Sequence, residues 1–445
     1  MPIRRSLKML LSKMAWHSYN TYRKGVYYRS QLSQTTELLD DAREAIMAFQ
    51  TERLKKLLRH AYRTTPYYRR LLKTDSPDIS QIPPLEKRDI REHLHLLCSE
   101  AFTARERIKN ATGGSTGTPL TFYQDRHYWN QRNLSVYYFD RWAGWNPGEP
   151  QLVVWGAPAD MEGDARWKHK LNNFWRNQYW LNGFHLTQTR MRNAYEKMER
   201  ARPQTILAYP SSLYQFARFV FENGLKPRWG LKGIISSAEM LHPHYRDLGE
   251  TVFTAKVFNR YGGREVGLIA MECAEGRMHI NCRDIYLEID SPDPYTIPGE
   301  ILITQLNNYV MPFIRYRIGD IGMLSDELCP CGNELPVLAD LFGRSTATFR
   351  TRTGTLIHGG YFTQRFYNVT GVSQFQLIQE TLRRCVLKLV IDKQWTEETR
   401  RYLVQSIQEV LGGDVVVAVE FVKEIPLPTS GKREFTISKV TAGTD

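Results

Sequence analysis

The sequence predicts an α/β protein with a large N-terminal domain, in which mixed sheets are covered by helices, and a small α+β C-terminal domain. Three observations carry this prediction. From about Leu152 onward, short apolar segments alternate with amphipathic helical segments. Beyond about residue 343 the pattern changes to a compact β-β-α-β unit. With 445 residues, the chain is long enough for roughly two or three domains.

Short apolar runs of strand length mark the large domain. They occupy residues 151–157, 205–210, 231–241, 255–263 and 300–304, and most end in Gly, Ser, Pro or polar residues. Helical segments at 189–201 and 211–224 lie between them. This alternation is typical of a largely parallel sheet covered by helices. Ligands of such sheets bind beyond the carboxyl ends of the strands, so we expect the chemistry there.

Helices are expected before this region, and a separate unit after it. Residues 38–72 have apolar positions at helical intervals, with a break at "TTPYY". The small unit has strand-like segments at 373–380, 383–392 and 414–422, and a helix at 396–411. We therefore divide the chain into domains 1–343 and 344–445, with a helical N-terminal segment of about 1–110.

Composition restricts the class of protein. Hydrophobic residues make up 42% and charged residues 24% of the chain, which is the globular balance and excludes a disordered or fibrous protein. The longest strongly apolar run, Val415 to Val422, is far shorter than the ~20 residues of a membrane span. The net charge of +13 favours anionic partners such as nucleotides or acidic lipids. No nucleic-acid reader motif occurs, so we expect no specific nucleic acid partner.

The first residues are basic and weakly apolar, and they predict an amphipathic helix. This helix either packs on the protein's own surface or makes a peripheral membrane contact. The six cysteines, without an export signal, predict a cytoplasmic protein. The sequence leaves open whether the chain is a monomer or a homodimer.

One loop has an unusual composition. Residues 112–118 are all Gly, Ser or Thr, and Pro119 ends the run. Such a loop offers backbone N–H groups and hydroxyls to a phosphate. It lacks the lysine of a Walker A loop. A plain surface turn is the alternative interpretation.

Three charged residues are candidates for nucleotide chemistry. Glu265, in "RYGGREVG", is a candidate Mg²⁺ ligand, with a helix cap as the alternative. Asp320, expected in a glycine-flanked turn of "RYRIGDIG", is a candidate for the two ribose hydroxyls, with a turn former as the alternative. Lys432, in "SGKREF", is a candidate for phosphate contact, with a solvated lysine as the alternative.

A second group of residues has the composition of a zinc site. Cys273 and His279 lie in "ECAEGRMH", and Cys329 and Cys331 lie in "CPCG". Three cysteines and one histidine suit tetrahedral structural Zn²⁺, although Cys-x-Cys is tighter than the usual gap. Cys282 is an alternative ligand, and buried thiols without a metal are the alternative interpretation.

Six motifs in order give the sequence a specific resemblance. It resembles the adenylate-forming acyl-CoA synthetase superfamily, in its phenylacetate–CoA ligase and CapK-like capsular polysaccharide branch. The resemblance runs from "LLRHAYRTTPYYRRLL" to the C-terminus. The motifs are "TGGSTGTP" for phosphate, "SSAEML" for adenine, "YGGREVG", "YRIGD" for ribose, the hinge "GRS" and the C-terminal "SGKREF".

The resemblance implies an AMP-forming carboxylate ligase. ATP and a carboxylic acid would give an acyl-adenylate and pyrophosphate, and coenzyme A or another acceptor would then displace AMP. It implies catalytic roles for Lys432 and for Glu265, which would hold Mg²⁺. It also implies that the small C-terminal domain is mobile. The implied ATP and AMP contacts are Ser115, Thr116, Gly117, Thr118, Ser237, Ala238, Glu239, Asn259, Tyr261, Gly262, Gly263, Asp320 and Arg344. The zinc ligands also look like positions at which members of the branch carry zinc.

Two features leave the second half-reaction and the substrate open. Where many relatives have Asp shortly after the hinge Arg, this chain has "RSTATF", which puts coenzyme A in doubt as acceptor. An amide-forming ligase or an adenylyltransferase in surface polysaccharide or secondary metabolite biosynthesis is one alternative. A non-catalytic nucleotide-binding relative is another. The acid substrate cannot be identified from the sequence.

Overall fold

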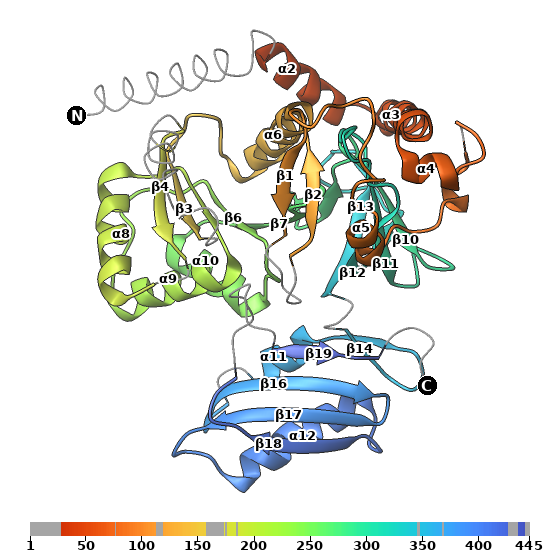
Figure 1. Cartoon of the computed structure of the whole chain (residues 1–445). Helices are drawn as coiled ribbons and strands as arrows, with labels where there is room; N and C mark the ends of the chain where they lie inside the picture. The colour runs from red at the N-terminus through yellow and green to blue at the C-terminus, as the bar shows by residue number, and fades with distance from the viewer. Residues whose placement is uncertain are drawn as a thin grey trace.

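The structure is a computed structural model that describes residues 28–75, 77–112, 119–156, 173, 176–183, 186–344, 348–366, 369–425 and 435–440 (Figure 1). Several sequence predictions lie outside these residues. They are the basic N-terminal helix, the phosphate-loop residues Ser115, Thr116, Gly117 and Thr118, and Lys432.

Helices begin the described chain. They are α2 (Tyr28–Leu39), α3 (Arg43–Thr64), α4 (Pro66–Leu71), the short 3₁₀ helix η1 (Ile79–Gln81) and α5 (Lys87–Glu92). The predicted break at "TTPYY" is confirmed. Thr65 is extended, with φ −112° and ψ 112°, because the ring of Pro66 disfavours helical geometry in the residue before it.

A mixed sheet is the centre of the large domain. Among the described residues it has 11 strands in the order β10-β11-β12-β13-β9-β8-β7-β6-β5-β3-β4. In chain order the strands are β3 (Gln151–Trp155), β4 (Gln178–Asn182), β5 (Thr205–Ala208), β6 (Gly233–Ser237), β7 (Val257–Gly263), β8 (Gly267–Glu272), β9 (Met278–Ile280), β10 (Ile285–Asp290), β11 (Gly299–Gln305), β12 (Tyr316–Ser325) and β13 (Val337–Arg344).

Only part of this sheet is parallel. Strands β3 to β7 pair in parallel, and helices α8 (Gln188–Ala201), α9 (Pro210–Glu222) and α10 (Pro243–Phe253) connect them (Figure 1). From β7 onward every pairing is antiparallel. The prediction of a largely parallel sheet is therefore wrong beyond β7. The turn between β7 and β8 is too short for the crossover that parallel strands need.

A separate small hairpin contains, between its two strands, the Gly/Ser/Thr-rich segment of the sequence. Strands β1 (Ile108–Ala111) and β2 (Thr121–Gln124) pair antiparallel, and residues 113–118 fall between them. Helix α6 (Arg126–Asp140) and the short 3₁₀ helix η2 (Arg141–Ala143) follow β2 directly. Asp125 caps α6, since its side chain accepts a hydrogen bond from the Tyr128 N–H at 2.6 Å.

The C-terminal residues form a separate sheet with its own hydrophobic cluster. The elements are β14 (Thr348–Arg350), β15 (Leu356–His358), α11 (Gly360–Phe366), β16 (Val372–Thr381), β17 (Arg384–Ile391), α12 (Glu397–Leu411), β18 (Val416–Phe421) and β19 (Thr436–Ser438). Strands β18-β17-β16-β19 make a 4-stranded sheet within the described residues. Its cluster draws only on residues from Phe349 to Phe435, which supports a boundary near residue 344. The boundary itself stays a prediction.

No described helix combines the length and the apolar character that a membrane crossing requires.

Candidate functional site

Two residues that are candidates for nucleotide binding contact each other, although their strands are not neighbours in the sheet. Tyr261, near the end of β7, donates a hydrogen bond from its hydroxyl to Asp320 Oδ2 of β12 at 2.7 Å. The end of β7 approaches β12 closely, since a Cβ added to Gly263 would lie 3.3 Å from Ile318 Cδ1. The Asp320 carboxylate is buried at 6% exposure. The structure therefore gathers the "YGG" and "YRIGD" motifs into one place.

The predicted setting of Asp320 needs correction. Asp320 lies within strand β12 and not in a turn. The preceding Gly319 has φ +85°, which glycine adopts without a steric penalty, and so a turn-like sequence continues a strand. Asp320 is also the cross-strand partner of Arg344, the last residue of β13. The candidate hinge therefore begins beside the candidate ribose contact.

Glu265 lies in the turn that joins β7 to β8. The turn connects two strands, so the helix-cap alternative for Glu265 is wrong. Its Oε1 accepts a hydrogen bond from the Tyr316 hydroxyl at 3.3 Å, and the side chain is partly exposed. A partly exposed carboxylate has the chemistry of an Mg²⁺ ligand, and Glu265 is therefore a candidate for that role.

The hairpin that carries the Gly/Ser/Thr loop is attached to this turn. The Gln124 amide, at the end of β2, donates to the carbonyl oxygens of Arg264 and Glu265 at 3.3 and 3.2 Å. At the base of the loop, Thr112 N–H donates to Leu120 O at 3.0 Å, and Leu120 N–H donates to Thr112 Oγ1 at 2.9 Å. These bonds attach the hairpin to the Glu265 turn at its Gln124 end, and they hold Thr112 against Leu120 at its other end, where residues 113–118 connect the strands. Nothing in the sequence indicated Gln124.

The β7–β8 hairpin requires glycine at position 262, because a side chain does not fit there. A Cβ on Gly262 would lie 2.5 Å from the Gly267 carbonyl oxygen, which no side chain tolerates. Before the motif, the Asn259 N–H donates to Glu272 Oε2 of β8 at 2.8 Å, which fixes this part of β7 to the neighbouring strand. Close backbone approach therefore explains the first glycine of "YGGREVG".

The predicted adenine segment follows β6, beside β7. The Ser237 hydroxyl donates to the Arg260 carbonyl oxygen at 2.9 Å. Ala238 has φ +73°, a left-handed conformation that costs a residue with a Cβ energy and often marks functional turns. Glu239 Oε2 accepts from the Ser211 N–H at 3.1 Å, in the first turn of α9, where a carboxylate is favoured. These three residues thus lie at the carboxyl end of the parallel strands.

One buried ion pair beside the site was not predicted. Arg260 Nη1 contacts Asp140 Oδ1 at 2.9 Å, and the two side chains are 14% and 5% exposed. Burial raises the pKa of Asp140, and Arg260 opposes this effect. The pair connects β7 to the last residue of α6. Arg260 stands within a quoted motif, but Asp140 carried no sequence signal.

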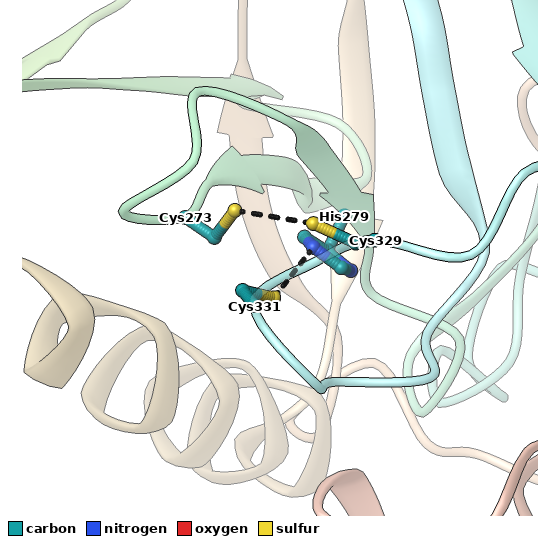
Figure 2. Close-up of side chains that lie close together, drawn as sticks. All are labelled: Cys273, His279, Cys329 and Cys331. Carbon is teal, nitrogen blue, oxygen red and sulfur yellow. Dashed lines mark hydrogen bonds between the residues drawn. The ribbon is translucent and has the colours of Figure 1, made fainter.

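The four predicted zinc ligands come together in a second site. Their ligand atoms all lie within 4.8 Å of one another (Figure 2). Cys273 Sγ is 3.6 Å from Cys329 Sγ, and Cys331 Sγ is 3.4 Å from His279 Nε2. Tetrahedral Zn²⁺ with its usual Zn–S bonds would place two sulfurs about 3.8 Å apart. The donor set and its spacing therefore fit structural zinc.

The surroundings of this cluster orient its ligands. His279 Nδ1 lies 3.1 Å from the Leu335 carbonyl oxygen, which makes Nδ1 the protonated nitrogen and directs Nε2 towards the sulfurs. The Glu275 N–H donates to Cys273 Sγ at 3.3 Å, which stabilises a thiolate. The alternative ligand Cys282 is not in the group, and burial raises its pKa to about 12. The expectation that Cys282 replaces a ligand is wrong.

Comparisons with known proteins agree with this architecture. The family description "CapK C-terminal domain" matches residues 349–439. Protein CapK of Staphylococcus aureus is 22% identical over 440 residues, which cover 93% of each chain. The predicted resemblance to the CapK and phenylacetate–coenzyme A ligase branch of the adenylate-forming proteins is thereby confirmed. The phenylacetate-coenzyme A ligase of Thermus thermophilus is 25% identical over 335 residues, covering 68% of this chain and 71% of that protein.

A solved structure shows the same fold. The 2-hydroxyisobutyryl-CoA ligase in its postadenylation state, in complex with 2-HIB-AMP, superposes with a TM-score of 0.70 and covers 91% of both chains. The identity is 21%, so this likeness establishes the fold of the branch. The predicted fold class is thereby confirmed.

Proposed function

We propose that this chain uses ATP to activate a carboxylic acid as an acyl-adenylate, releases pyrophosphate, and then transfers the acyl group to coenzyme A. One observation supports the site most strongly. The Glu265 turn, the hairpin that carries residues 113–118, and the Tyr261–Asp320 hydrogen bond converge beside the carboxyl ends of β6 and β7. Nucleotides bind at such strand ends.

Asp320 and Glu265 have proposed roles that their positions support, and the roles of the other candidates rest on the motifs alone. Asp320, oriented by the Tyr261 hydroxyl, would accept hydrogen bonds from the ribose hydroxyls. Glu265 would hold Mg²⁺ between the turn and the phosphates. We assign the phosphates to Ser115, Thr116 and Thr118, the α-phosphate to Lys432, and a further ribose or phosphate contact to Arg344.

The first step is a displacement at phosphorus. A carboxylate oxygen attacks the α-phosphorus, and the bond from that phosphorus to the bridging oxygen of the β-phosphate breaks. Pyrophosphate leaves with the bonding electrons, and the acid becomes a mixed anhydride with AMP. This step depends mainly on positioning and on charge neutralisation, which the roles above supply.

Two kinds of acceptor are considered for the second step. Coenzyme A is the acceptor named for the phenylacetate-coenzyme A ligase relatives. In this chain Thr346 stands where many relatives have an acidic residue after the hinge. An amine or a sugar hydroxyl is therefore the second candidate acceptor, in surface polysaccharide or secondary metabolite biosynthesis. Because the proposed reaction consumes ATP, we expect it to take place in the cytoplasm.

We also propose that Cys273, His279, Cys329 and Cys331 hold one structural Zn²⁺. The cluster fixes the turn before β9 to the segment before β13. Zinc would stabilise that connection and would take no part in the reaction.

The test is carboxylate-dependent pyrophosphate release from ATP, measured over aryl, fatty, hydroxy and amino acids. Release with one class of acid supports the adenylation step. Acceleration by coenzyme A supports thioester formation, and acceleration by an amine instead supports the amide-forming alternative. Lys432→Ala serves as the matched variant, which should bind ATP and release no pyrophosphate. Bound ATP with no release for any acid would favour a non-catalytic relative.

A further inference from the structure

A stretch near the N-terminus of the described chain concentrates positive charge. Residues 53–74, "RLKKLLRHAYRTTPYYRRLLKT", contain eight Lys or Arg residues and no Asp or Glu. The whole chain has a net charge of +13, so this stretch alone accounts for a large share of it. Such a run is either a solvated helix surface or a contact surface for an anion. The exposure and the ion pairs of its side chains help to choose between these two interpretations.

Helix α3 separates its charges from its apolar residues. Leu54, Leu57, Leu58 and Ala61 are buried on one side of the helix. The cations that lie three and four positions apart occupy the opposite, exposed side. They are Lys55, Lys56, Arg59 and Arg63.

The cations of α4 continue this surface. The Arg69 guanidinium donates to the Arg63 carbonyl oxygen at 2.9 Å, so the two helices place their charges side by side. Arg70 and Lys73 are exposed, and Leu71 between them is 38% exposed. We call this surface the basic face. It consists of Lys55, Lys56, Arg59, Arg63, Arg69, Arg70 and Lys73.

Acidic partners neutralise only part of the basic face. Asp75 pairs with Arg63 at 2.9 Å and lies 3.9 Å from Arg59. Glu100 pairs with Arg69 at 2.7 Å. Within the described residues, Lys55, Lys56, Arg70 and Lys73 have no ion-pair partner. The face therefore keeps an uncompensated charge that folding does not use.

The basic face is also separate from the candidate nucleotide site. That site lies at the ends of β6 and β7, whereas α3 and α4 lie at the outer edge of the large domain (Figure 1). All seven residues of the basic face are exposed, so a large anionic surface can approach them. An exposed leucine among cations is typical of surfaces that rest on a bilayer.

We propose that the basic face docks the protein peripherally on an anionic phospholipid membrane. The lipid phosphates pair with the four uncompensated cations, and Leu71 enters the interface between headgroups. Each cation near an anionic surface contributes about fivefold to partitioning, and salt screens the effect. This surface acts whether or not the proposed adenylation is correct.

The test measures flotation of the full chain with vesicles of equal parts phosphatidylglycerol and phosphatidylcholine, and with pure phosphatidylcholine vesicles. The variant carries Lys55→Gln, Lys56→Gln, Arg70→Gln and Lys73→Gln, all at exposed positions. The matched control carries Arg383→Gln, Lys393→Gln, Arg401→Gln and Lys423→Gln, which remove the same charge from exposed positions of the C-terminal unit. Unchanged thermal unfolding of both variants shows that each is folded.

We expect binding to the anionic vesicles at low salt and its loss at high salt. The basic-face variant should bind at least tenfold more weakly, and the control should bind like the unmodified chain. No binding to anionic vesicles, or equal binding by both variants, would overturn the proposal. A basic-face variant that loses duplex DNA binding while keeping vesicle binding would overturn it in favour of a nucleic acid partner.

Discussion

The Tyr261 hydroxyl and the Asp320 carboxylate are joined by a 2.7 Å hydrogen bond across 59 positions of sequence. Strands β8, β9 and β13 separate the strands of these two residues in the sheet order. The contact brings an aromatic ring and a ribose-binding candidate together, and so it defines one side of the proposed nucleotide site.

Substitution of Asp320 should weaken ATP binding. Asp320→Asn removes the charge that would hold the ribose hydroxyls, and hydrogen bonds to a charged group contribute about 1.5–3 kcal/mol. We expect the KM for ATP to rise roughly 10- to 100-fold, with a smaller change in kcat. Tyr261→Phe, which keeps the ring, should raise KM by only about fivefold. Pyrophosphate-release kinetics measure both, and an unchanged KM in Asp320→Asn would remove the ribose role.

Substitution of Glu265 should change the Mg²⁺ dependence of the reaction. Glu265→Gln keeps the size of the side chain and the Tyr316 contact but removes the negative charge. We expect activity at limiting Mg²⁺ to fall on the order of 100-fold, because charge neutralisation at the phosphates is impaired. A Mg²⁺ titration of pyrophosphate release measures this. Glu398→Gln, in the exposed first turn of α12, is the control. Identical Mg²⁺ titration curves for the unmodified chain, Glu265→Gln and Glu398→Gln would contradict the role of Glu265 as an Mg²⁺ ligand.

Gly262 should not tolerate a methyl group. In Gly262→Ala the new Cβ would lie 2.5 Å from the Gly267 carbonyl oxygen, so the β7–β8 hairpin must move. We expect a loss of about 1–3 kcal/mol in the free energy of unfolding, together with reduced activity. Denaturant unfolding measures the first. Gly230→Ala, where a Cβ would meet no atom within 4 Å, should be nearly neutral. Equal stability of the two variants would show that the hairpin relaxes freely.

Purified protein should contain about one zinc per chain, bound by the Cys273–His279–Cys329–Cys331 cluster. Cys329→Ser should lose the metal and unfold at a lower temperature, because the four groups would no longer be crosslinked. Elemental analysis and thermal unfolding measure this. Cys98→Ser is the control, since Cys98 lies outside the cluster and donates to the Leu94 carbonyl oxygen, as a serine can. Metal-free protein of equal stability would exclude the zinc site.

Acid should destabilise the fold partly through His60. Burial lowers the pKa of His60, whose Nε2 lies 2.9 Å from the Tyr309 carbonyl oxygen. The unfolded chain therefore binds a proton that the folded chain rejects, and stability falls as pH drops below the ordinary histidine pKa of about 6.5. His60→Gln should flatten this dependence between neutral pH and the lowered pKa. Denaturant unfolding across that range measures it, and an unchanged slope would assign the effect to other groups.

Part of the candidate site could be predicted from short sequence motifs, because glycine turns and closely spaced metal ligands lie within a few residues of one another. The glycines of "YGGREVG" mark a close backbone approach, and the structure gives the reason at Gly262. The "CPCG" segment marked a metal-ligand turn, and its cysteines meet Cys273 and His279. In contrast, Gln124 and Asp140 are ordinary residues of a strand and a helix. Their importance comes from contacts with Glu265 and Arg260, far away along the chain.

Local sequence predicted part of the order of helices and strands, including α3, β3, β5 to β7 and the C-terminal unit, because apolar spacing and turn residues act over a few positions. It also determined which residue types stand in each motif. The antiparallel pairing after β7 and the position of Asp320, within a strand and opposite Arg344, depend on the tertiary structure. Strand order depends on which distant apolar faces bury each other, and local periodicity contains no information about that choice.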